Sequence, residues 1–190
     1  MITSPTVDGT QRQDDVREGS RWSARGNVAF WGLLFGTAVM IAADESLQTR
    51  VAAATTDNAF ASDAVLLTVL RIATFAFGLL FALLQAWIYG LMFGAVTATA
   101  RPGLMTGWGY VLLAQAPFVV LVVGAYLLEG MSAVAQVQSA GARMLLGVVS
   151  VAVYTYLTAR SRQVELPRLL AFGLLAVGVN TALLLLSAQG

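Results

Sequence analysis

The sequence predicts an all-α protein that folds as a polytopic bundle of transmembrane helices. Of its 190 residues, 58% are hydrophobic and 11% are charged, and the mean hydropathy is +0.76. Charged residues usually make up about a quarter of a soluble domain. The apolar residues also gather into runs comparable to the roughly 20 residues that a helix needs to cross the hydrocarbon core. We expect five spans, at about residues 27–43, 64–100, 107–128, 144–159 and 167–187.

Residues 1–26 precede the first apolar run and are polar, with no periodic apolar face that could be buried. We expect them to form a disordered cytoplasmic tail, and residues 27–190 to form the membrane domain. Trp22 lies just before the first span, where an amphipathic ring suits the headgroup layer. An uncleaved anchor is favoured over a cleaved signal peptide, because the polar leader is long and the segment offers only a poor cleavage site.

Two segments of contrasting polarity follow the first span. Residues 44–63 are polar, and Leu47, Val51 and Ala54 recur at the spacing of a short surface helix. Residues 64–100 are apolar and contain no cluster of turn residues at which a hairpin could reverse. The sequence therefore predicts one long second helix, with Arg71 extending toward the outer interface.

Proline and glycine set the later boundaries. Arg101-Pro102-Gly103 ends the second helix, because proline disfavours helix in the residue before it and glycine permits a turn. Pro117 cannot donate to the carbonyl of Leu113, which predicts a kink in the third span. Residues 129–142 form a weakly polar connection, and Pro167 suits the first turn of the last helix.

The arginines test this segmentation independently, because positive residues are enriched in cytoplasmic connections. With the N-terminus inside, the outer connections contain only Arg50 and Arg143. The cytoplasmic segments contain Arg12, Arg17, Arg21, Arg25, Arg101, Arg160, Arg162 and Arg168. An odd number of spans places the C-terminus outside, and the chain is expected to be a multi-pass protein of the plasma membrane, in contact with membrane lipids.

Several classes of chemistry are excluded by composition. The chain has no Cys and no His, which removes disulfides, thiolate chemistry, cysteine-attached haem and imidazole-dependent metal sites. It has no phosphate-cradling loop, nucleophile elbow, zinc helix or paired-carboxylate motif. We expect no enzymatic activity, no cofactor and no metal, and the net charge of +1 gives no indication of a nucleic-acid partner.

Three amide side chains fall near the middle of the spans: Gln85, Gln115 and Asn180. If they converge, they line a small polar cavity beside the kink at Pro117. The simpler alternative is hydrogen bonding between helices. Four aromatic residues near the cytoplasmic ends of the second and third spans predict an interfacial belt; they are Trp87, Tyr89, Trp108 and Tyr110.

Small residues and arginines define two further features. The pairs Gly32 and Gly36, and Gly90 and Gly94, each place two glycines on one helical face, which favours packing within the chain over a dimer interface. A basic cytoplasmic rim suited to lipid headgroups or a partner protein is formed by Arg101, Arg160, Arg162 and Arg168.

The order of these features resembles the Yip family of Ypt/Rab-interacting membrane proteins. The likeness is carried by Arg101-Pro102-Gly103, by the stretch from Trp108-Gly109-Tyr110 to Ala116-Pro117, and by Leu166-Pro167-Arg168. Residues 1–26 lack the Asp-Leu-Tyr-Gly-Pro type motif of eukaryotic members, so the resemblance implies a bacterial-type member. It implies five spans, no enzymatic activity and a class that includes accessory subunits of export ABC transporters.

Two functions therefore compete. The first is a non-enzymatic scaffold or accessory subunit, which binds a membrane-protein partner or a second copy of itself through its small-residue faces and basic rim. The second is a small passive transporter or channel that uses the three amides. An ion-coupled transporter is disfavoured, because no Asp or Glu lies at depth in the spans.

Overall fold

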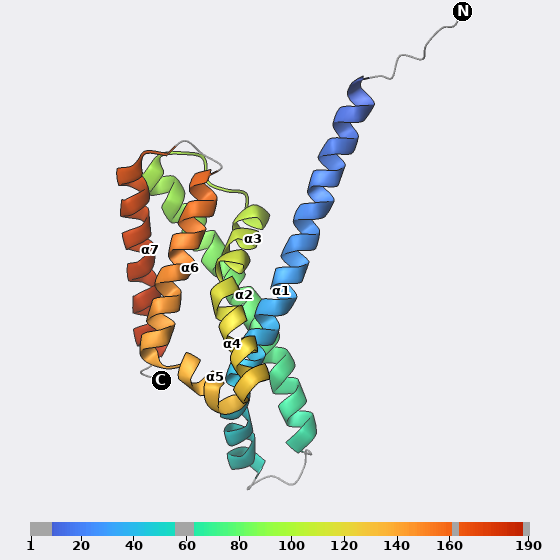
Figure 1. Cartoon of the computed structure of the whole chain (residues 1–190), viewed down its shortest axis with the longest axis vertical. Helices are drawn as coiled ribbons and strands as arrows, with labels where there is room; N and C mark the ends of the chain where they lie inside the picture. The colour runs from blue at the N-terminus through green and yellow to red at the C-terminus, as the bar shows by residue number, and fades with distance from the viewer. Residues whose placement is uncertain (1–8, 56–62, 161–163, 188–190) are drawn as a thin grey trace, which may run out of the picture.

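The computed structural model describes residues 9–55, 63–160 and 164–187, and every element within them is helical (Figure 1). In chain order the helices are α1 (Gly9–Thr55), α2 (Asp63–Thr97), α3 (Leu104–Ala114), α4 (Ala116–Glu129), α5 (Met131–Val137), α6 (Ala140–Arg160) and α7 (Leu166–Ser187). The all-α class predicted from the sequence is confirmed for this part of the chain.

Several of these helices have the length and composition of membrane spans. Three of them suffice to cross a membrane, in the segments Gly26–Ala53, Ala64–Thr97 and Ala140–Arg160. The pair α3 and α4 forms a fourth if it is taken as one bent span, and α7 contributes a shorter apolar helix, Leu166–Ala182. A membrane protein is therefore indicated by the fold as well as by composition.

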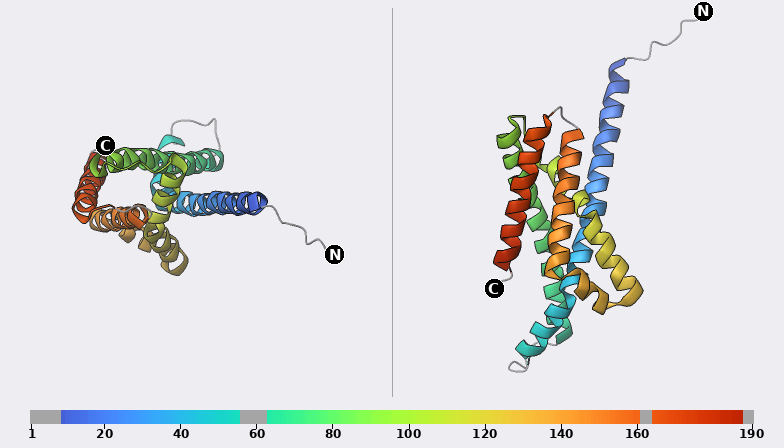
Figure 2. Two further views of the ribbon diagram at one scale, coloured as in Figure 1. Left: turned by 90° about the horizontal axis from the view of Figure 1, so that it is seen from above. Right: turned by 60° about the vertical axis from the view of Figure 1, so that its left-hand side comes forward.

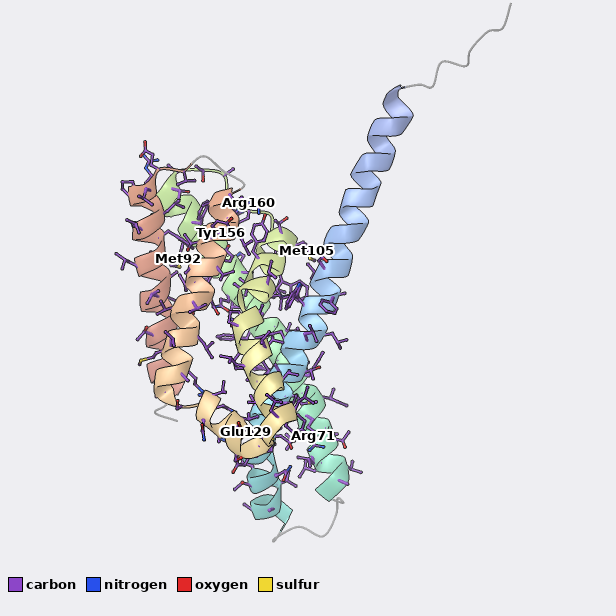
Figure 3. All side chains as sticks on the ribbon, viewed as in Figure 1. Arg71, Met92, Met105, Glu129, Tyr156 and Arg160 are labelled. Carbon is purple, nitrogen blue, oxygen red and sulfur yellow. The ribbon has the colours of Figure 1, made fainter. Side chains whose placement is uncertain are left out.

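Large apolar side chains also cover the outside of the bundle (Figure 3). Phe77, Leu128 and Leu174 are 70%, 84% and 76% exposed. Monomeric soluble proteins rarely expose continuous apolar surface of this kind. Lipid tails are the solvent in which such a surface is stable.

The first helix is longer at both ends than the sequence predicts. Residues 9–26 are helical, where we expected a disordered tail, and residues 44–55 continue the same helix, where we expected a connection with a separate surface helix. Once the apolar segment is helical, each added residue gains a backbone hydrogen bond without a new nucleation step. Residues 1–8 and 56–62 lie outside the described part of the chain.

The long second helix and the kink in the third span are both present. α2 is one helix of 35 residues and ends where Ala98 adopts a positive φ of 53°. α3 and α4 meet at Gln115 with a bend of 42°. Pro117 explains this break, because it has no N–H to donate to the carbonyl one turn earlier.

The connection predicted at residues 129–142 contains an unexpected helix, the short α5 (Figure 1). Gly130 precedes it with a φ of 75°, a conformation that glycine adopts readily because it lacks a Cβ. α5 leads the chain sideways from the end of α4 to the start of α6. It thereby lies across the lower end of the bundle in Figure 1. We use "lower end" for the end of the bundle at which α1 ends at Thr55, α4 ends at Glu129 and α6 begins at Ala140.

The long helices alternate in direction along the bundle (Figures 1 and 2). The opposite, upper end is defined by Thr97, Leu104 and Arg160, and the N-terminal part of α1 projects beyond it. α1 packs on α2, α3 and α4. On the other side, α7 packs on α2, and α6 packs on α3 and α4; neither of these two helices packs on α1 among the described residues. α2, α3 and α4 thus lie between α1 and the α6–α7 pair.

Candidate functional site: an amide-lined cavity

A cavity of about 850 Å³ is lined by residues of α1, α2, α4, α5, α6 and α7. Gln85 on α2, Gln115 at the break between α3 and α4, and Asn180 on α7 all line it. The structure thus brings together the three amides that the sequence singled out. The rest of the wall is largely apolar, and three of its residues are Phe35, Phe81 and Phe118.

Direct hydrogen bonds join these amides to each other and to neighbouring helices. Gln85 Nε2 donates to Asn180 Oδ1 at 3.1 Å and to Tyr89 Oη at 3.0 Å. Ser150 Oγ on α6 donates to Gln115 Oε1 at 3.2 Å. The helix-to-helix bonding that we considered as an alternative is therefore present, and it occurs at the wall of a cavity.

These bonds leave the N–H groups of one amide available to the cavity. Gln85 uses both of its N–H groups, and the side chain of Asn180 also hydrogen-bonds to Tyr89. Within the described part of the chain, no hydrogen bond uses the side-chain N–H groups of Gln115. Asn180 Nδ2 lies beside Gly147, another residue of the cavity wall, since a Cβ built there would be 3.9 Å from it. An amide carries two donors, so this wall favours a ligand with acceptor oxygens.

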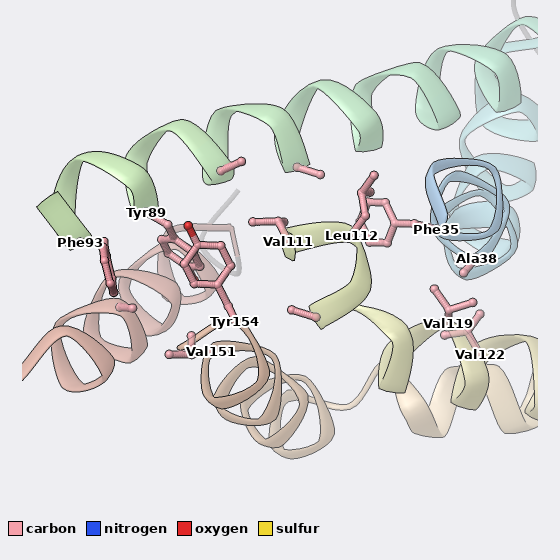
Figure 4. Close-up of a cluster of buried hydrophobic side chains, with 14 of the residues drawn as sticks. Phe35, Ala38, Tyr89, Phe93, Val111, Leu112, Val119, Val122, Val151 and Tyr154 are labelled. Carbon is pink, nitrogen blue, oxygen red and sulfur yellow. The ribbon is translucent and has the colours of Figure 1, made fainter. Parts of the chain in front are cut away.

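A cluster of buried aromatic rings begins one helical turn beyond Gln85, on the side of the upper end; Figure 4 labels three of them, Tyr89, Phe93 and Tyr154. Tyr89 and Tyr154 pack edge to face with ring centroids 5.1 Å apart, and Phe172 lies 5.3 Å from Phe93 in the same arrangement. All four side chains are buried, with Tyr89 only 3% exposed. Tyr89 therefore does not belong to the interfacial aromatic belt in which we placed it, whereas Trp87 is 51% exposed on the outer surface.

Polar and charged side chains surround the opposite, lower end of the cavity. Glu45 and Ser46 come from α1, Gln138 follows α5, and Arg143 lies in the first turn of α6. Arg143 donates to the Gln138 side-chain oxygen, and Gln138 Nε2 donates to the backbone carbonyl of Ala42 on α1. This chain of hydrogen bonds links α6 to α1 across the mouth of the cavity.

Sequence reasoning missed most of the residues around the three amides. Tyr89 follows Gln85 by one helical turn, so the spacing alone could have suggested their contact. Ser150 and Gln138 carry no comparable signal, because their partners are 35 and 96 residues away in the chain. Arg143 and Glu45 were assigned only to connections.

The two glycine pairs differ in how closely they pack against the rest of the chain. A Cβ at Gly36 would lie 2.4 Å from the Phe75 ring on α2, and a Cβ at Gly32 would contact Leu79 at 3.6 Å. Gly94 approaches the Thr99 backbone, whereas nothing lies within 4 Å of a Cβ at Gly90. The first pair therefore serves the α1–α2 contact, as the sequence analysis favoured.

The arginines of the predicted basic rim lie at the upper end, except for Arg162, which is outside the described residues. Arg101 and Arg160 are exposed, and Figure 3 shows Arg160 at the upper end. Arg168 Nη1 donates to the Thr97 carbonyl at the end of α2 at 3.0 Å, and its Nε is 3.5 Å from Glu165. Arg168 thus helps to fix α7 against α2.

A second hollow of about 1120 Å³ lies on the outside, between α1, α2 and α3. Trp31, Leu33, Leu79 and Trp108 are among its lining residues. The Trp108 Nε1 group is buried and has no hydrogen-bond partner in the described part of the chain.

Comparisons with other proteins add no assignment to these sites. Neither family models, curated proteins nor solved structures gave a match. The described residues contain no group of three or more potential metal ligands from His, Cys, Asp and Glu. The resemblance to the Yip family stays a prediction from the sequence.

Proposed function

We propose that this chain is a non-enzymatic, five-crossing protein of the plasma membrane that binds a small polar solute in the amide-lined cavity and allows its passive passage. The convergence of Gln85, Gln115 and Asn180 on one cavity carries this proposal. Cavities of roughly 300–1,000 Å³ with a few placed polar groups in an apolar wall are typical of small-molecule sites. The volume of about 850 Å³ falls within this range.

The proposed orientation places the upper end in the cytoplasm. The helices alternate in direction (Figure 1), which suits crossings by α1, α2, the α3–α4 pair, α6 and α7. Arg101, Arg160 and Arg168 then face the cytoplasm, in agreement with the enrichment of positive residues there. The mouth of the cavity faces outside, and the aromatic cluster separates it from the cytoplasm.

Solute flux in proteoliposomes tests the proposal. Urea and glycerol serve as probes, because both are small, uncharged and rich in hydrogen-bonding groups. We expect the Gln85→Leu and Gln115→Leu double variant to abolish the protein-dependent flux, since leucine removes the polar groups while conserving approximate volume. Gln136→Leu is the matched control, because Gln136 is exposed on α5 and does not line the cavity.

An assay of folding distinguishes a loss of flux caused by the missing polar groups from a loss caused by misfolding. Both variants must elute as monodisperse species in detergent before flux is compared. Flux that is unchanged in a folded double variant contradicts the proposal, as does the absence of protein-dependent flux of either probe through the unaltered chain.

A scaffold or accessory subunit, such as one assisting an export ABC transporter, is the second candidate. The N-terminal part of α1 projects from the bundle beyond the upper end (Figure 1), where a partner could bind without displacing any helix. The glycine faces give this candidate less support, because Gly32 and Gly36 contact α2. Purification in mild detergent at native expression should recover a stoichiometric partner, and a solitary monomer would contradict this role.

A further inference from the structure

We infer that the cavity recognises a zwitterionic, amino-acid-like solute whose charged end is held by Glu45 and Arg143 and whose uncharged polar end reaches the amides. This inference rests on the proposed function and specifies its substrate class. It follows from the distribution of charge along the cavity, from the hydrogen bonds that hold Arg143, and from the donors at the inner end.

The cavity carries opposite charges on opposite sides of its mouth. Glu45 belongs to α1 and Arg143 to α6, two helices that do not contact each other among the described residues. The ion pairs of the described chain are Arg71 with Asp44 and Arg168 with Glu165, so Glu45 and Arg143 have no charged partner there. Two unpaired opposite charges at one mouth match the ammonium and the carboxylate of a zwitterion.

Arg143 is held in place while most of its donors stay available. Its Nη2 donates to Gln138, which is itself bonded to the backbone of α1. A guanidinium has five N–H donors in a planar fork that matches a carboxylate. The structure uses one of them, so a carboxylate could be bound without breaking the link across the mouth.

The inner end of the cavity selects an uncharged group. Gln85, Gln115 and Asn180 are its polar residues there, and the lining residues carry no charge beyond Glu45 and Arg143. A charged group that loses its water without a counter-charge is strongly disfavoured. The N–H groups of Gln115 instead favour a carbonyl or ether oxygen, such as that of the side-chain amide of glutamine.

A matched series of four compounds tests this inference on the full-length protein in proteoliposomes. L-Glutamine carries all three groups, glutaramic acid lacks the ammonium, 4-aminobutanamide lacks the carboxylate, and butyramide lacks both charges. We measure competition of each compound against radiolabelled glutamine uptake. Glutamine should compete best, and each missing charge should weaken competition by about tenfold or more, since hydrogen bonds to charged groups contribute roughly 1.5–3 kcal/mol.

Charge-neutralising variants test which residue binds the carboxylate of the solute and which binds its ammonium. Arg143→Gln should remove the advantage of glutamine over 4-aminobutanamide, and Glu45→Gln should remove its advantage over glutaramic acid. Arg50→Gln is the control, because Arg50 is exposed near the same end of the bundle but does not line the cavity. Selectivity in the control should equal that of the unaltered chain.

These measurements also show whether a failure concerns this inference alone or the proposed function as well. Gln85-dependent flux of butyramide with no preference for glutamine would overturn the zwitterion and leave passive transport standing. If none of the four compounds moves and urea and glycerol do not move either, both proposals are wrong. Equal competition by glutamine in Arg143→Gln and in the unaltered chain overturns the role of Arg143.

Discussion

The guanidinium of Arg71 lies 2.6 Å from the carboxylate of Asp44 and thereby joins α2 to α1 across 27 residues of chain. The Asp44 side chain is 18% exposed and that of Arg71 is 36% exposed. From the sequence alone, Arg71 was expected to reach the membrane interface by itself. Its partner could not be predicted, because Asp44 was placed in a polar connection with a separate surface helix and not in the continuation of α1.

Separating this pair should lower the thermal stability of the protein. Asp44→Asn removes the counter-charge of Arg71, and we expect a loss of about 1 kcal/mol, because the arginine keeps part of its hydration. A double-mutant cycle with Arg71→Gln, read from unfolding in detergent, measures the coupling. Additive effects of the two changes would show that the pair contributes nothing.

Alanine at Gly36 should disturb the contact between α1 and α2. A Cβ there would lie 2.4 Å from Phe75 Cε2, and overpacking of this kind costs about 1–3 kcal/mol. Gly32→Ala is the matched control, because its nearest neighbours are at 3.6 and 3.7 Å. Phe75→Leu should partly restore the melting temperature of Gly36→Ala, and equal melting temperatures of the two alanine variants would contradict the prediction.

Opening the aromatic cluster should connect the cavity with the upper end of the bundle. Phe172 is fully buried, with its ring 5.3 Å from Phe93 and 6.0 Å from Tyr154. Phe172→Ala should increase urea flux, at a stability cost of about 3–5 kcal/mol. Phe172→Leu leaves a smaller gap if the alanine variant does not fold. Phe77→Ala, on the 70% exposed Phe77, should leave flux unchanged, and a folded Phe172 variant with unaltered flux would show that the cluster is no barrier.

Single-cysteine labelling tests the orientation directly, because the chain contains no native Cys. Gln48→Cys near the lower end should react with a membrane-impermeant maleimide in intact cells. Glu165→Cys, whose native side chain is 75% exposed at the upper end, should react only after the membrane is permeabilised. Labelling of both positions in intact cells is incompatible with the proposed topology.

Structural features that depend on local chemistry could be predicted from the sequence alone. Pro117 alone accounts for the bend at Gln115, and the unbroken apolar run accounts for the single helix α2. Hydropathy could not locate the ends of α1, because a helix that has already formed can continue through polar residues. α5 was missed because seven residues are too few for a periodic pattern to distinguish a helix from a loop.

The candidate site was predictable only in part, for a geometric reason. Polarity within apolar runs identified Gln85, Gln115 and Asn180 one by one. Whether they face a common space depends on how the helices are rotated and tilted, which is determined by packing between distant segments. The bond from Gln85 to Asn180 spans 95 residues, and no local pattern could have paired them.

The continuity of α1 has a mechanical consequence. One uninterrupted helix runs from Gly9 to Thr55, about 70 Å at the usual rise per residue, and it includes Ala42 and Glu45 at the rim of the cavity. A rigid rod of this length acts as a lever, so a force that tilts its projecting N-terminal arm must also displace the rim of the cavity at the lower end of the bundle.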